Sequence, residues 1–273
     1  MKKLVLALTA VAALTTSASA ADLGARPYKA PPPVAPVYNW TGFYISGGGG
    51  GGLWNADSNV QSTGVVGPLG SFGPAGLALT RDQRLGGSGW FGTVAVGYDW
   101  QFNGRWVVGL FGDGQFGNIR GSLSDPFLGT EGQEKLRTSY AAGVRLGYLV
   151  APNVLSYVNA GYSGSEWSGT TQTSLFGAPG TTTTNSFNRN GWFVGGGFEN
   201  NLDIFGITAP GWFWKTEYRS AFYDRISLPT TFGPASGFTG LTGTAVTFKP
   251  WNQTISTSLV YRFNWGGPPV PNY

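Results

Sequence analysis

The stretch Gly211–Arg225, GWFWKTEYRSAFYDR, changes character at every second residue. One alternating set is aromatic or small and consists of Trp212, Trp214, Thr216, Tyr218, Ser220 and Phe222. The other set holds three charges in a row and consists of Phe213, Lys215, Glu217, Arg219, Ala221 and Tyr223. Because successive side chains of a β-strand point to opposite faces, the stretch predicts a strand with one apolar and one charged face. Which face meets water decides the class of fold.

The same alternation recurs along the chain in eight segments, an even number. The predicted strands are residues 41–54, 89–102, 105–118, 135–150, 154–167, 190–203, 211–225 and 251–265. The breaks near residues 103, 152 and 207 are brief. The other connections are long and rich in Gly, Thr, Ser and Pro, at 55–88, 119–134, 168–189 and 226–250. The pattern predicts an all-β fold: an eight-stranded antiparallel up-and-down barrel with four long loops at one end and short turns at the other.

The short breaks carry turn residues. Asn103 and Gly104 form a pair that favours a type I′ hairpin turn, because both positions of that turn need a positive φ. Pro152 has no N–H to donate to a sheet, so a strand has to end before it.

The apolar face fits lipid better than a buried core. Its aromatic side chains gather near strand ends, as the interfaces of a membrane require, whereas a soluble sandwich would bury them in mid-strand. The candidates also exceed the 5–6 residues usual for globular strands. We therefore predict a transmembrane barrel, although the alternation does not settle the facing of residues 154–167. The expected lipid-interface aromatics are Trp90, Trp100, Trp106, Trp212, Trp214, Tyr261 and Phe263.

The charged face then points into the barrel. An eight-stranded barrel has an interior just wide enough for side chains to fill, and unpaired charges there would be costly. A near-balance of charge predicts an ion-pair network that blocks the lumen, with inward glycines leaving room for the long side chains. The predicted members are Asp99, Asp113, Arg137, Arg145, Glu199, Lys215, Glu217, Arg219 and Arg262.

The two ends of the chain suggest export. Lys2 and Lys3 precede an apolar run that ends in Ala18-Ser19-Ala20, the pattern of a cleaved signal peptide over residues 1–20. Residues 21–39 are proline-rich and predict a periplasmic linker, followed by the barrel at 40–265 and a tail at 266–273. Removing the leader leaves 15 basic side chains against 13 acidic ones, a balance that implies no nucleic-acid partner.

The residue types that are missing argue against an enzyme or a cofactor protein. The chain has no histidine and no cysteine, and its single methionine is the first residue. Ser-His-Asp and Cys-His arrangements are therefore excluded, and tyrosine is the remaining haem ligand. The run Gly47–Gly52 contains G-x-G-x-x-G, but neither a helix start nor Lys-Ser follows it. We expect no cofactor and no metal, while adhesion of haem to loop aromatics such as Phe127 or Phe176 stays open.

Four stretches resemble a known family. They are AADLGARPYKAPPPVAPVYNWTGFYISG (20–47), GWFVGGGFE (191–199), WKTEY (214–218) and VYRFNWGG (260–267). They are similar to the small outer-membrane immunogenic proteins of alphaproteobacteria, which are porin-like eight-stranded barrels.

The resemblance implies a protein of the Gram-negative outer membrane, surrounded by membrane lipid and lipopolysaccharide. It also implies insertion by the barrel-assembly machinery, loops that meet host or other extracellular partners, and a role in envelope integrity or surface interaction. The assembly machinery would read the aromatic end of the last strand, at Tyr261, Phe263 or Trp265. Family members described as porins or haem binders leave two alternatives: a small passive pore for ions or small solutes, and haem capture at the surface.

Overall fold

The structure is a computed structural model that describes residues 38–204 and 207–263. The predicted leader, most of the proline-rich segment, the tail and Trp265 lie outside the described residues. Within the described chain, no helix has the length and hydropathy that crossing a membrane requires.

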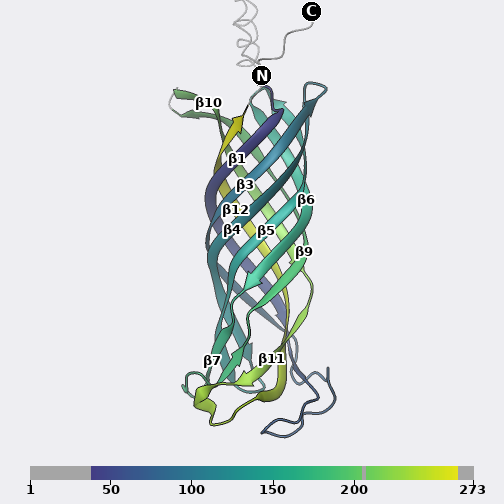
Figure 1. The fold of residues 1–273 in the computed structure, drawn as a ribbon, viewed down its shortest axis with the longest axis vertical. Coiled ribbons are helices and arrows are strands. Elements are labelled where there is room, and N and C mark those ends of the chain that lie inside the picture. Colours follow the sequence, from purple (N-terminus) through teal and green to yellow (C-terminus); the bar gives the residue numbers. More distant parts are fainter. Residues whose placement is uncertain (1–37, 205–206, 264–273) are drawn as a thin grey trace, which may run out of the picture. The chain divides into compact units, whose positions relative to one another are not determined.

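Eight long antiparallel strands run side by side and close on themselves (Figure 1). Each strand pairs with the next along the chain, and the first also pairs with the last through Phe43 opposite Phe263 to Asp57 opposite Lys249. This closure confirms the predicted up-and-down barrel. The eight strands are β1 (Gly42–Ser58), β3 (Gln83–Phe102), β4 (Trp106–Asp125), β5 (Thr130–Ala151), β6 (Val154–Trp167), β9 (Phe187–Ile204), β10 (Ile207–Tyr223) and β12 (Leu241–Phe263).

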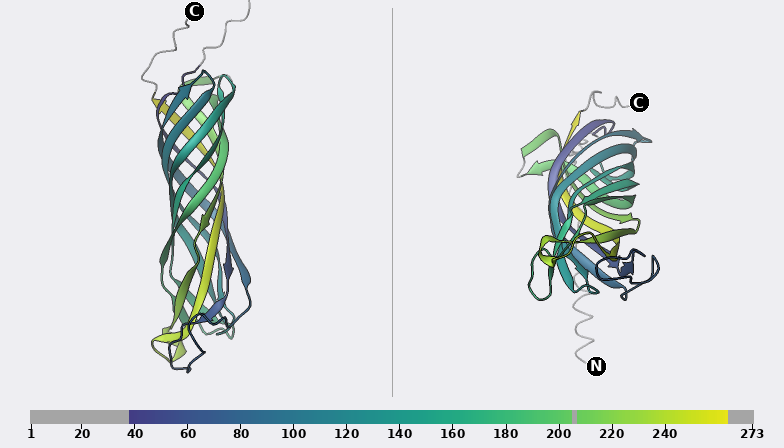
Figure 2. Two further views of the ribbon diagram at one scale, coloured as in Figure 1. Left: turned by 90° about the vertical axis from the view of Figure 1, so that its right-hand side faces the viewer. Right: turned by 60° about the horizontal axis from the view of Figure 1, so that its bottom comes forward.

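Four short strands extend the sheet at the end that carries the longer loops, which is the lower end in Figure 1 and comes forward on the right of Figure 2. They are β2 (Val60–Ser62), β7 (Thr170–Ser174), β8 (Thr182–Thr184) and β11 (Ile226–Phe232). β7 pairs with β5 and β8, β11 with β8 and β12, and β2 with β12. The short 3₁₀ helix Pro234–Ser236 follows β11. Longer loops mark the extracellular end of such barrels.

The turns at the opposite end have the geometry that the sequence predicts. Asn103 and Gly104 have φ values of 47° and 68°, as a type I′ turn requires. Strand β5 ends at Ala151, immediately before Pro152.

The extracellular strands are longer than expected. Most of the predicted loop 119–134 is strand, because β4 continues to Asp125 and β5 begins at Thr130. β12 likewise starts at Leu241, inside the predicted loop 226–250. The apolar outer face ends here while the pairing goes on, so an apolar pattern could not reveal these extensions.

Two rings of aromatic side chains circle the outer surface and bound its apolar band. Ten residues separate Trp90 from Trp100 on β3, and ten separate Trp106 from Phe116 on β4, which corresponds to a band about 25 Å tall on tilted strands. We take this band as the membrane-spanning part. Its periplasmic ring contains Phe43, Trp100, Trp106, Tyr148, Trp212 and Tyr261, and its extracellular ring contains Trp90, Phe116, Tyr140, Tyr162, Trp192 and Phe222.

The facing of the strands answers the question that Gly211–Arg225 raises. On β10 the charged set from Phe213 to Tyr223 is buried, while Trp212, Trp214 and Tyr218 are exposed. The charged face therefore points inward. The buried inward side chains on β6 are Leu155, Tyr157, Asn159, Ser163, Ser165 and Trp167. Three of these six are apolar or aromatic, which is why alternation alone left this strand unassigned.

Glycines allow one seam of the barrel to close tightly. A Cβ atom at Gly48 would lie 2.0 Å from the Thr257 carbonyl oxygen, and one at Gly50 would lie 2.0 Å from that of Ile255. Both glycines face inward on β1 and the carbonyls belong to β12, so any larger residue would collide with the backbone of the neighbouring strand.

Candidate functional site in the barrel interior

Two arginines and two carboxylates form a closed cluster in the periplasmic half of the interior. Asp99 on β3, Arg145 on β5, Glu199 on β9 and Arg262 on β12 are each at most 3% exposed. Arg145 donates from Nε to Asp99 Oδ1 at 2.7 Å and again from Nη2 to Oδ2, and from Nη1 to Glu199 Oε2 at 3.3 Å. Arg262 donates to both acids at 2.7 Å. Four strands are thus joined across the lumen by one charge-balanced cluster.

Aromatic rings and a glycine enclose this first cluster. The Arg145 guanidinium lies 4.5 Å from the Tyr44 ring centre, and that of Arg262 lies 4.6 Å from the Trp40 ring centre, distances at which cation–π attraction acts. A Cβ atom at Gly109 would lie 2.1 Å from Asp99 Oδ1. Glycine at this position therefore gives the long charged side chains their space.

A second ion-pair cluster lies beside the first. Arg219 binds Asp113 through two parallel hydrogen bonds of 2.9 and 2.7 Å, and Glu217 Oε1 through a third of 2.7 Å. The Tyr157 hydroxyl donates to Glu217 Oε2 at 2.8 Å. Lys215 is buried on the same strand as Arg219, but no ion pair joins it to another described residue.

Arg137 corrects the sequence prediction. It was expected inside, but its side chain is exposed on the outer surface. The register of β5 against β6 shifts between Leu136 and Thr138, so Arg137 is an extra residue at a bulge and loses its place in the alternation. Without Arg137, the eight other predicted residues contribute four positive and four negative charges, so the interior network is neutral.

Aromatic side chains occupy the extracellular half of the interior instead. We call Trp54, Trp167, Phe187 and Phe248 the aromatic plug; each is at most 8% exposed. Trp167 stacks on Phe187 with ring centres 5.8 Å apart, and Phe248 lies 5.2 Å from Trp167 and 5.5 Å from Trp54. Leu85, Ile119, Leu123 and Leu136 pack around these rings.

The aromatic plug was missed at the sequence level because its residues lie at or beyond the ends of the apolar alternation. Trp54 is the last residue of its predicted strand and Phe248 lies in a predicted loop. Every second residue of β1 and β12 faces inward. Counting on in this way past the apolar band reaches Trp54 and Phe248, and this alternation is the signal that could have located them.

A buried carboxyl without a cationic partner lies further toward the extracellular end. Glu134 is fully buried on β5, six residues beyond Tyr140 of the extracellular ring. Its Oε2 accepts from the Thr170 hydroxyl at 2.7 Å and its Oε1 from the Lys135 N–H at 3.3 Å. Burial outweighs these hydrogen bonds and raises the pKa of Glu134 to about 7.

The interior geometry suits structure more than chemistry. The four carboxylates of the two ion-pair clusters are all engaged by arginine. Among the described residues, no group of three or more His, Cys, Asp or Glu could hold a metal ion. The two clusters join strands across the lumen.

The predicted interface aromatics lie on the outer surface. Trp90 is the most open of them at 80% exposure, and Trp100, Trp106, Trp212 and Trp214 are between 40% and 60% exposed. Tyr261 and Phe263 are half-buried at the periplasmic end of β12, with their rings 4.8 Å apart. Trp265, the other expected assembly residue, lies outside the described residues.

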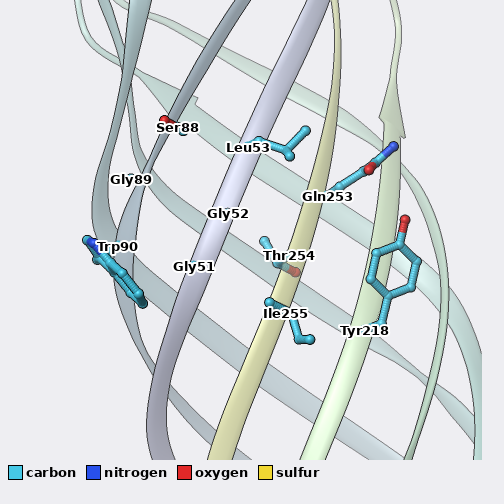
Figure 3. Close-up of a pocket in the computed structure, with 10 residues that line it drawn as sticks. All are labelled: Gly51, Gly52, Leu53, Ser88, Gly89, Trp90, Tyr218, Gln253, Thr254 and Ile255. Carbon is cyan, nitrogen blue, oxygen red and sulfur yellow. The ribbon is translucent and has the colours of Figure 1, made fainter.

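A groove of about 520 Å³ opens on the same outer surface, across β3, β1, β12 and β10 (Figure 3). Its floor is the backbone at Gly51 and Gly52, and Trp90, Tyr218 and Ile255 flank it. The groove lies on the outside of the barrel, whereas the ion-pair clusters and the aromatic plug lie inside it.

Comparison with known proteins agrees with this architecture. No family model matches the chain. Over 168 residues it is 32% identical to the 31 kDa outer-membrane immunogenic proteins of Brucella melitensis and Brucella suis, a match that covers 59% of this chain. The chain spans 65% of the length of these curated relatives.

Two solved structures are among those with partial similarity to the chain. The outer membrane protein OprG from Pseudomonas aeruginosa is 10% identical, with a TM-score of 0.48 over 82% of this chain and 98% of that one. Neisserial surface protein A is 12% identical, with a TM-score of 0.36 over 82% and 98%. The closed antiparallel barrel and the Brucella relatives together support the predicted resemblance and the location: the chain is an outer-membrane β-barrel protein that is similar to the 31 kDa outer-membrane immunogenic proteins.

Proposed function

We propose that this outer-membrane protein is non-enzymatic: its closed barrel contributes to envelope integrity and presents extracellular strands and loops for contact with other surfaces. The observation that supports the proposal is that buried side chains occupy the lumen at two levels, in the ion-pair clusters and in the aromatic plug. An interior filled at two levels with buried side chains supports an anchoring role over a pore.

Single-channel current in a planar bilayer tests the closed lumen. We expect refolded protein, with folding checked by heat-modifiable gel migration, to insert without conducting. Stable current steps proportional to salt concentration would instead establish the passive pore for ions or small solutes. An Arg145→Ser, Glu217→Ser variant sharpens the test. If ion selectivity changed in that variant, the ions would have to pass through the lumen of this barrel.

The loops carry the surface-contact part of the proposal. Val66, Leu175 and Phe176 are apolar and 73%, 71% and 98% exposed at the extracellular end, so their side chains are available for contact with another surface. A deletion strain should show greater detergent sensitivity or weaker surface adhesion. A strain unchanged in both would contradict the proposed role.

Assembly and haem binding stay predictions. Recognition by the barrel-assembly machinery is expected to depend on Tyr261 and Phe263, so that replacing both with alanine lowers the folded fraction in the membrane.

Haem capture is expected to shift the haem absorption spectrum when haem is titrated into the folded barrel, and the shift should depend on loop aromatics such as Phe176.

A further inference from the structure

Three cations form a patch on the outer surface just beyond the extracellular aromatic ring. We call Arg120, Lys135 and Arg137 the cationic triad. Arg120 on β4 lies directly opposite Lys135 on β5, and Arg137 follows two residues along. Arg120 and Arg137 are exposed and Lys135 is half-exposed.

Backbone irregularities bring the triad together. The register of β4 against β5 shifts between Phe116 and Ile119, and that of β5 against β6 shifts between Leu136 and Thr138. The second shift turns Arg137 outward, onto the same face as Lys135. Bulges commonly re-aim a side chain in this way and are features of a fold more often than defects.

The triad lacks a protein counter-ion. No ion pair within 4.0 Å joins any of its members to another described residue. Arg120 donates to the neutral Asn118 side chain at 2.6 Å. The Glu134 carboxylate points inward, Glu131 lies four residues from Lys135, and Glu166 lies opposite Thr138. Arg120 and Lys135 are like charges directly opposite each other across the sheet and repel, so an external anion beside them would be stabilising.

Arg84 shows the contrasting case on a neighbouring strand. It is also outward and exposed, but Asp57 accepts from its Nε at 3.4 Å and the Trp251 ring lies beneath it at 5.2 Å. The barrel therefore supplies a carboxylate partner for the outward Arg84, whereas no described carboxylate pairs with the cationic triad.

The height of the triad identifies the kind of anion. Arg120 lies four residues beyond Phe116, and Arg137 lies three residues before Tyr140, both on the loop side of the aromatic ring. Aromatic rings of this kind sit at headgroup level, so the cations meet the phosphate zone of the outer leaflet. The outer leaflet of this membrane is built from lipopolysaccharide, whose lipid A disaccharide carries phosphate groups.

From these observations we propose that the cationic triad binds the phosphorylated disaccharide headgroup of lipopolysaccharide. The guanidinium groups of Arg120 and Arg137 offer forked donors to phosphate oxygens, and Lys135 between them adds a point charge. The proposal rests on the outer-membrane location and is independent of whether the lumen conducts.

Binding of diphosphorylated lipid A to the refolded full chain in detergent, measured by native mass spectrometry, tests the proposal. The triple variant R120Q/K135Q/R137Q should bind about tenfold more weakly or worse, since each cation at a membrane surface contributes to phosphate attraction. The matched control R81Q/R84Q/R105Q loses the same charge at exposed positions elsewhere and should bind within about twofold of the wild type. Gel migration confirms that each variant is folded, and the single variant R137Q should show a smaller loss.

Two lipid probes distinguish the source of the phosphate. Dephosphorylated lipid A should bind the wild type as weakly as phosphorylated lipid A binds the triple variant. Equal binding of phosphorylated lipid A to the triple variant and the wild type would overturn the site. Displacement by phosphatidylglycerol at equal concentration would overturn the assignment to the glycolipid headgroup.

Discussion

Opposite kinds of side chains occupy the two halves of the lumen. In the periplasmic half, Asp99, Arg145, Glu199 and Arg262 cancel one another's charge across four strands. In the extracellular half, the aromatic plug and the leucine and isoleucine side chains around it form a buried apolar cluster. A carboxylate is tolerated in the first region because arginine pairs with it, whereas Glu134 in the second has hydrogen bonds but no described cation within ion-pair distance. The difference teaches that the two levels are held by independent interactions, so a change at one level leaves the other in place.

The largest effect is expected where one ionic partner is removed. Arg145→Met would leave Asp99 and Glu199 buried with only Arg262, and losing one member of a buried pair costs about 3–5 kcal/mol. The free energy of unfolding of the refolded barrel in guanidinium measures this loss. Arg105→Met, at an exposed arginine of the periplasmic turn, is the control. A loss for Arg145→Met no larger than that of the control would show that the cluster adds nothing to stability.

The unpaired carboxyl sharpens the comparison through pH. The pKa of folded Glu134 is raised to about 7, above its unfolded value of 4.5, so the folded state binds the proton more tightly. The contribution of Glu134 to stability is therefore fully present below pH 4.5 and is lost as the pH rises from 4.5 through 7. Glu134→Gln should be more stable than the wild type at pH 8, by up to about 3 kcal/mol, with the difference vanishing near pH 4. Unfolding curves at both pH values check this, and a difference that does not change with pH would contradict it.

A milder change tests the aromatic plug. Phe248→Leu keeps an apolar side chain but removes ring contacts with Trp54 and Trp167, so we expect a loss of about 1–2 kcal/mol. The variant should still block current in a planar bilayer, because the ion-pair clusters remain. Conduction by this variant would show that the plug alone closes the lumen.

The smallest effect is expected at Arg137. Its exposure on the outer surface predicts that Arg137→Met changes the free energy of unfolding in lipid-free detergent by less than about 0.5 kcal/mol. The same substitution at Arg145 provides the comparison. If Arg137→Met lowered the free energy of unfolding by nearly as much as Arg145→Met, the exposed position of Arg137 would be contradicted and Arg137 would belong to the interior network.

Alternation predicted the barrel well because lipid imposes a strict two-residue period on every spanning strand. It placed eight of the nine network residues inside, among them Asp113, Glu217 and Arg219, which the structure brings together. It failed at Arg137, because a bulge adds one residue to the strand. Residues on the far side of the bulge then face the opposite way from what a two-residue count predicts. It also ended the strands too early, because beyond the membrane the outer residues become polar and the apolar contrast disappears. The ion-pair partners themselves depend on which strands meet across the lumen, which no single strand reveals.

The continuation of β4 and β5 beyond the membrane band also determines what the protein shows to its surroundings. The hairpin leaves only residues 126–129 unpaired at its tip, and there Asp125 Oδ1 accepts the N–H groups of Phe127 and Leu128 at 3.0 Å. A receptor or antibody that binds this tip meets a shape already fixed by paired strands. It therefore loses little conformational entropy on association, and its affinity depends more on complementarity than on ordering a flexible epitope.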